Sequence, residues 1–107
     1  MRGDLVTIAI QGDFGKPRPA LVIQSDRFEQ HPSLTILPVT STLVDAPLLR
    51  VTVLPDDDNG LSKPSQVMVD KPMTVKLDKV GKVFGRLNAD VMVEIERRLL
   101  VFLGIVR

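Results

Sequence analysis

An arginine and a threonine at the ends of two apolar segments are the residues of this sequence best suited to shared chemistry. Arg18 comes just before the apolar residues 20–23, and Thr40 follows the apolar stretch 34–39. A buried strand does not favour a guanidinium, so we expect Arg18 at the mouth of the fold, where it can meet an anion. Phosphoryl transfer depends mainly on positioning and charge stabilisation, and arginine matches phosphate oxygens with a planar fork. Arg18 with the Thr40 hydroxyl therefore predicts a minimal phosphate site.

Ser41 and Asp70 occupy similar places, each at a predicted strand end or on a strand face opposite the apolar one. Residue types alone do not establish a site, because an arginine at the start of a strand is commonly a surface residue. A purely structural role for these polar residues therefore stays open at this point.

The composition argues against metal, thiol and nucleotide chemistry. Cysteine is absent and His31 is the single histidine, with no carboxylates at ligand-like spacing around it. The acidic run 56–58 is interpreted as a solvated turn, and no glycine-rich phosphate loop opens a helix. We expect no metal and no cofactor.

Length and charge place the chain among small globular domains. It has 107 residues, 44% of them apolar, and a net charge of +1. One domain over residues 1–107 is expected, with no leader, no membrane span and a cytoplasmic location. Nucleic-acid contact would have to come from local clusters, such as Lys16 with Arg18 or Lys71 with Lys76 and Lys79. With four phenylalanines, no tryptophan and no tyrosine, only Phe14 lies in a loop where it could stack on a base, so any RNA footprint should be short.

The hydrophobic pattern is mostly of period two, which is typical of β-strands. Six strands are predicted, over residues 6–10, 19–24, 34–39, 49–53, 66–70 and 83–87. Asn88 is expected to cap a final helix that Gly104 ends. The predicted fold class is mostly β (α+β), a small, partly closed antiparallel barrel with a C-terminal helix.

The final helix is apolar on two sides. One predicted stripe, which should pack on the sheet, contains Val91, Met92, Ile95, Leu99, Phe102 and Leu103. Val93 and Leu100 fall on nearly the opposite side. A loop of the same chain could cover them, but a domain this small has few loops, so we favour burial by a second protomer or another protein.

Several segments, in this order and spacing, resemble the MazF/PemK (Kid) family of toxin endoribonucleases from bacterial toxin–antitoxin pairs. They are Arg2-Gly3-Asp4, the Gly-x-x-Arg-Pro-x-Leu-Val segment 15–22, Phe28, the Pro-x-Thr-Ser segment 38–41, Gly60-Leu61 with Ser65-Gln66-Val67, the segment 70–74 and Gly85-Arg86-Leu87. The resemblance covers almost the whole chain. It implies an SH3-like, CcdB/MazF-like barrel, a homodimer, a cognate antitoxin, and sequence-selective cleavage of single-stranded mRNA without metal.

The resemblance also implies residue roles. Arg18 would stabilise the charge on the phosphoryl oxygens while the ribose 2′-hydroxyl attacks, and Thr40 would place the scissile phosphate with support from Ser41. Asp70 matches an acidic residue assigned in some members to proton transfer or RNA contact. Phe14 and Lys16, in the first loop, would touch RNA.

The chain departs from the family pattern at two places. The first loop lacks the histidine of some members, and Met68 stands where certain members have an arginine. The general base and acid are therefore unassigned. Two alternatives remain open here: a CcdB-like DNA gyrase poison, given the C-terminal Gly104-Ile105, and a catalytically inactive RNA-binding module.

Overall fold

The computed structural model describes residues 1–10 and 16–107. Within these residues, seven strands form one antiparallel sheet in the order β4-β5-β3-β2-β1-β7, and β6 pairs with β3 off this path. The strands are β1 (Asp4–Ala9), β2 (Pro17–Val22), β3 (Ser33–Thr40), β4 (Arg50–Val53), β5 (Ser65–Met68), β6 (Met73–Lys76) and β7 (Val80–Arg86). The helical elements are the 3₁₀ turns η1 (Asp26–Phe28) and η2 (Leu77–Lys79) and the helix α1 (Ala89–Phe102).

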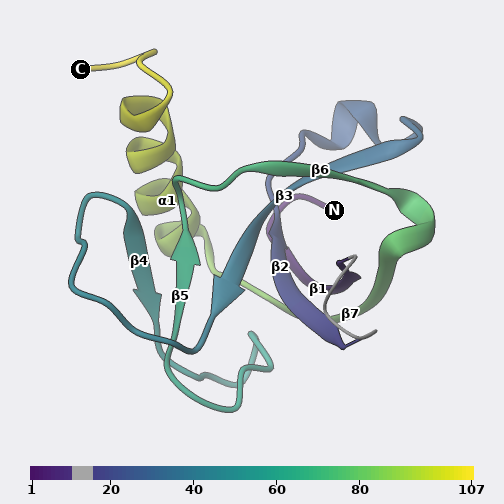
Figure 1. Ribbon diagram of the computed structural model, residues 1–107, viewed down its shortest axis with the longest axis horizontal. Coiled ribbons are helices and arrows are strands. Elements are labelled where there is room, and N and C mark those ends of the chain that lie inside the picture. Colours follow the sequence, from purple (N-terminus) through teal and green to yellow (C-terminus); the bar gives the residue numbers. More distant parts are fainter. Residues whose placement is uncertain (11–15) are drawn as a thin grey trace.

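The sheet curls strongly on itself without closing as a hydrogen-bonded barrel. β6 pairs with β3, β7 pairs with β1, and the short turn η2 joins β6 to β7. In Figure 1, β1, β2, β3, β6 and β7 curve around a common centre, while β4 and β5 extend to one side beneath α1. The expected mostly antiparallel architecture with a C-terminal helix is confirmed, and the SH3-like description holds only approximately.

Strands β1, β2 and β3 are buried on both faces. The register aligns Leu5, Leu21 and Leu37 across the three strands, and each is 0% exposed. This leucine row belongs to a core cluster that also includes Met92 and Ile95 of α1. The opposite face builds a separate cluster from Val6, Ile8, Ala20, Val22, Ile36 and Val75. Double coverage explains why these strands are almost continuously apolar.

The final helix begins and ends as the sequence predicts. The Asn88 side-chain oxygen accepts a hydrogen bond of 2.9 Å from the Val91 backbone N–H, and Gly104 follows the helix at a φ of +76°. The expectation that Phe102 and Leu103 pack on the sheet was wrong: they are 45% and 52% exposed. Both lie at the very end of α1, past the residues that the sheet buries.

The prediction of six strands was also wrong, because it missed β6. This strand has only two apolar residues, Met73 and Val75, between polar neighbours, so its own pattern is weak. It forms because β3 is eight residues long and offers its first half to β6 and its last residues to β5.

The connection from β4 to β5 is held by a buried asparagine. Asn59 is 0% exposed, and its side-chain amide donates to the Leu54 carbonyl at 2.9 Å. Its side-chain oxygen accepts from the backbone N–H groups of Asp56 at 3.2 Å and Leu61 at 3.0 Å. The acidic side chains of residues 56–58 are exposed, as expected, but the turn is anchored in the fold rather than merely solvated.

Two glycines bring this connection against β7. A Cβ on Gly85 would lie 2.0 Å from the Asn59 carbonyl oxygen, and one on Gly60 would lie 2.3 Å from the Phe84 carbonyl oxygen. Gly60 also has a φ of +65°, a conformation that favours glycine. The connection and β7 therefore touch backbone to backbone.

We predict that Asn59→Ala destabilises the protein by about 2 kcal/mol or more, because three backbone groups lose their buried partner. Urea unfolding monitored by circular dichroism measures this change. The control is Asp57→Ala in the same turn, which should change the unfolding free energy by less than about 0.5 kcal/mol. Equal stability of the two variants would contradict the anchoring role.

Candidate active site at the open end of strands β2 and β3

The predicted arginine and threonine come from neighbouring strands at the same edge of the sheet. The β2–β3 register pairs Ala20 with Pro38, and its continuation by two residues sets Arg18 opposite Thr40. On its other side Arg18 pairs with Ile8 of β1. Ile8 is buried, whereas Arg18 is exposed, so the core ends at this point.

Arg18 and Thr40 line a shared cavity of about 310 Å³, and Ser41 lines it with them. Both also line a neighbouring hollow of about 270 Å³, together with Met68. The structure therefore brings together the guanidinium and the hydroxyl that the sequence paired. Met68 contributes no charge to this hollow.

The Thr40 hydroxyl is oriented by its own turn. Its oxygen accepts a hydrogen bond of 3.1 Å from the backbone N–H of Thr42. A hydroxyl has one hydrogen to donate, and this bond does not use it. Thr40 is thus set to donate to an anion in the cavity.

Part of the lining of the 310 Å³ cavity was not predicted as part of a site. It comes from Phe84 of β7 and from the segment 60–65, including Ser62 and Lys63. The motif pieces Gly60-Leu61 and Ser65 indicated that this segment belongs to the family pattern, but nothing in the sequence indicated that it lines the same cavity as Arg18.

Among the described residues, none of the other predicted contacts lines this cavity. Lys16 is exposed just before β2, and Phe14 falls outside the described residues. Asp70 and Lys71 follow the end of β5, and neither lines the two hollows. Because β5 runs antiparallel to β3, they lie toward the end of this strand pair remote from Thr40 (Figure 1). The structure does not gather all seven predicted residues around one pocket.

Asp70 is held by its neighbour. The Lys71 ammonium donates to one Asp70 carboxylate oxygen at 3.0 Å, and this bond lowers the pKa of Asp70 below its ordinary value, against the opposing effect of burial. The positive charge of Arg50 adds to the lowering. The other oxygen, Oδ1, is buried without a hydrogen-bond partner among the described residues. A carboxylate with a lowered pKa is a weak proton acceptor at neutral pH.

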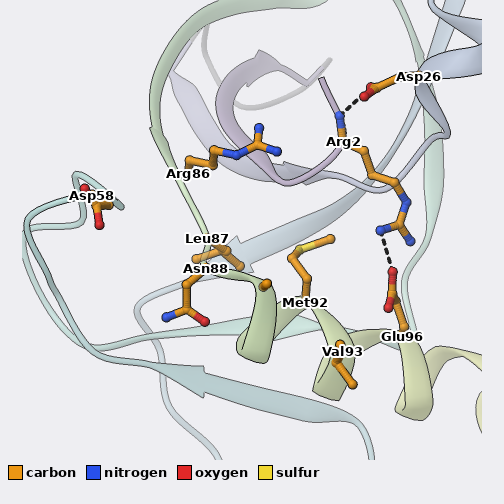
Figure 2. Close-up of a pocket in the computed structure, with 10 residues that line it drawn as sticks. Arg2, Asp26, Asp58, Arg86, Leu87, Asn88, Met92, Val93 and Glu96 are labelled. Carbon is orange, nitrogen blue, oxygen red and sulfur yellow. Dashed lines mark hydrogen bonds and ion pairs between the residues drawn. The ribbon is translucent and has the colours of Figure 1, made fainter.

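A larger hollow of about 680 Å³ lies at the start of α1, but its arginines serve the fold. In Figure 2, Arg2 forms an ion pair of 2.5 Å with Glu96 of the helix. Arg86, which also lines this hollow, forms a 2.7 Å pair with Asp4. The Arg2-Gly3-Asp4 motif thus ties the start of the chain to β7 and α1.

Other kinds of site find no support in the described part of the chain. Within residues 1–10 and 16–107, no three His, Cys, Asp or Glu side chains gather where they could hold a metal ion. In the same residues, no helix has the length and apolarity needed to cross a membrane.

Comparison with known proteins decides the family. Residues 1–103 match the family described as PemK-like, MazF-like toxin of type II toxin–antitoxin system. The chain belongs to this family. A protein of Mycolicibacterium smegmatis described as a probable endoribonuclease MazF is 48% identical over 105 residues, which cover 97% of this chain and 96% of the relative.

Solved structures agree with the family fold. A MazE–MazF crystal structure from Deinococcus radiodurans matches with a TM-score of 0.79 and 26% identity, covering 96% of this chain and 94% of that one. An endoribonuclease from a mycobacterial species, solved in complex with its cognate antitoxin, matches with a TM-score of 0.83 and 21% identity. That match covers 100% of this chain and 97% of the other, and it supports the fold alone.

We predict that Lys71→Ala raises the pKa of Asp70 toward the unperturbed value of about 3.9, because the hydrogen-bonding ammonium is gone. Carboxyl ¹³C chemical shifts followed against pH measure this change. Since the folded pKa is below the unfolded one, the pair stabilises the fold above about pH 4, and this contribution is lost as the pH falls through the folded pKa. Lys76→Ala is the matched control and should leave the Asp70 titration unchanged; an unchanged titration in Lys71→Ala would contradict the pairing.

Proposed function

We propose that this chain cleaves single-stranded mRNA by attack of a ribose 2′-hydroxyl on the adjacent phosphorus, with Arg18 and Thr40 as the catalytic residues. The family and the 48% identity to a probable endoribonuclease make the chain an endoribonuclease toxin of the toxin–antitoxin class. The gyrase-poison and inactive-module alternatives are not favoured by these comparisons. The observation that carries the residue assignment is the cavity shared by Arg18 and Thr40.

The proposed step uses charge and position rather than a metal. The 2′-oxygen bonds to phosphorus as its proton leaves, and the bond from phosphorus to the 5′-oxygen breaks as that oxygen gains a proton. The products are a cyclic 2′,3′-phosphate and a free 5′-hydroxyl. Negative charge builds on the phosphoryl oxygens, where Arg18 would donate two parallel hydrogen bonds and Thr40 one more. Ser41, in the same cavity, would help to hold the phosphate. The groups that move the two protons are unassigned.

RNA contacts beyond the cavity are proposed for Phe14, Lys16, Asp70 and Lys71. Lys16 is exposed two residues before Arg18, close enough in the chain to meet a neighbouring nucleotide. Contact with Asp70 and Lys71 requires that the RNA also run along β3 and β5 toward the far end of this strand pair. We further propose that residues 1–107 act as one domain in the cytoplasm, where mRNA is translated.

An antitoxin is the proposed protein partner. A relative of the same fold is solved with its cognate antitoxin, and MazE accompanies MazF in the Deinococcus structure. We propose that an acidic segment of the antitoxin occupies the groove near Arg18 and competes with RNA for it.

A homodimer is proposed from the surface of α1 and the residues after it. Large apolar side chains are left 37–67% exposed there: Val93, Leu100, Val101, Phe102, Leu103, Ile105 and Val106. Val93 and Leu100 lie on one side of the helix and Phe102 on nearly the opposite side, so the exposed residues do not form a single stripe. So many large apolar side chains left exposed on one helix and the residues after it are typical of an interface. Association of two chains through this helix about a twofold axis would cover them.

The purified protein should cut a long single-stranded RNA in the presence of EDTA and leave 5′-hydroxyl ends. Cleavage ends are mapped by sequencing after ligation that depends on prior 5′-phosphorylation. Activity lost with EDTA, or ends that ligate without phosphorylation, would contradict the proposed chemistry.

In the same assay Arg18→Ala and Thr40→Ala should lose at least about 100-fold in rate, as expected for removal of a transition-state donor. Arg27→Ala and Thr74→Ala remove the same side chains from exposed positions outside the cavity and should cut like the wild type. Full activity of both cavity variants would move the active site elsewhere.

The exposed apolar side chains of α1 predict a dimer of the 11.8 kDa chain at micromolar concentration, measured by light scattering. Leu100→Glu should give a monomer, because a carboxylate would be buried in the interface. Leu77→Glu, the same change at a leucine 46% exposed in η2, should stay dimeric. A monomeric wild type would defeat the proposal.

A further inference from the structure

The cavity lined by Arg18 and Thr40 has a second cationic side chain in its lining. Lys63 lies in the connection between β4 and β5 and lines the 310 Å³ cavity with Arg18, Thr40 and Ser41. It is exposed, and among the described residues no carboxylate forms an ion pair with its ammonium. Arg18 and Lys63 therefore contribute two cationic side chains to the lining of one polar cleft.

The backbone that carries Lys63 is fixed from both directions. Ser65, which is 5% exposed, donates its hydroxyl to the Lys63 carbonyl at 2.9 Å. On the other side, Asn59 holds Leu61, and Gly60 lies against the Phe84 backbone. Binding by a lysine in a loop ordinarily costs conformational entropy of both backbone and side chain. Here only the side chain has to be ordered.

We propose that Lys63 binds a phosphate of the RNA next to the scissile one, so that the substrate crosses the cleft between Arg18 and the segment 60–65. This inference rests on the proposed function, because it takes single-stranded RNA as the occupant. RNA fits the wall better than a purely anionic ligand does. Besides the cations and hydroxyls, the cavity is lined by Pro19, Leu61 and Phe84, which offer apolar surface to a base or ribose.

Lys63 is assigned to binding rather than to the reacting group. An ammonium acts as a flexible point charge, whereas the planar fork of Arg18 suits the phosphate that changes geometry. Removal of Lys63 should therefore raise KM and leave kcat within about threefold of the wild type, because binding to a neighbouring phosphate is equal in the ground and transition states.

The experiment measures the affinity of a single-stranded RNA with 2′-O-methyl at the mapped cleavage nucleotide, by fluorescence anisotropy across a series of NaCl concentrations. Lys63→Ala should weaken binding about 5- to 30-fold at low salt. It should also reduce the slope of log K against log[NaCl] by about 0.7, the value for one lost phosphate contact on a single strand. Lys63→Arg should restore the slope, and Arg27→Ala, which removes an exposed cation in η1 outside the cavity, should leave it unchanged.

The possible outcomes distinguish failure of the Lys63 contact from failure of the proposed ribonuclease function. A wild type that cuts no RNA, but binds a fully 2′-O-methylated single strand with the Lys63-dependent slope, would refute the proposed function and support the phosphate contact. A wild-type slope in Lys63→Ala would overturn the contact even if Arg18→Ala is inactive. A Lys63→Ala variant that binds RNA normally but loses affinity for an acidic antitoxin peptide would also overturn it, in favour of a protein contact.

Discussion

Burial of the central strands on both faces is the constraint on which the rest of the structure depends. Leucines fill one side of β1, β2 and β3, and valine, isoleucine and alanine fill the other, so most central positions of these strands are apolar. Thr7 and Thr35 are exceptions, and the hydroxyl of each is hydrogen-bonded to a neighbouring strand. Arg18 and Thr40 stand on adjacent strands where the double coverage stops, so the register that aligns the leucine row also sets them opposite each other.

The same constraint explains how much could be predicted from the sequence. Continuous apolar runs fixed the positions of β2 and β3, and hence of the residues at their ends. β6 escaped prediction because its strand character comes from pairing with β3 rather than from its own alternation. Lys63 was not predicted either. The sequence of the β4–β5 connection does not show which cavity it lines, because its position depends on Asn59, Gly60 and Gly85, which place it against β7.

The residue type of Asp70 suggested a role in proton transfer or RNA contact, but its surroundings give little support for proton transfer. Its neighbour Lys71 holds it in the charged form, and the cavities lined by Arg18 do not include it. The polar lining of the cleft therefore consists of cationic and hydroxyl side chains from three segments, each at the start or end of a strand. This arrangement favours stabilisation of a charged phosphate over proton transfer by a carboxylate.

The pairing of the first strand with the last has a consequence for synthesis. β1 reaches its partner only after β7 is made, and the ion pairs of Arg2 with Glu96 and Asp4 with Arg86 join residues near the two chain ends. A growing polypeptide on the ribosome cannot complete this sheet until β7 has emerged. Because Phe84 of β7 lines the cavity with Arg18 and Thr40, that cavity is also incomplete until this late strand is available.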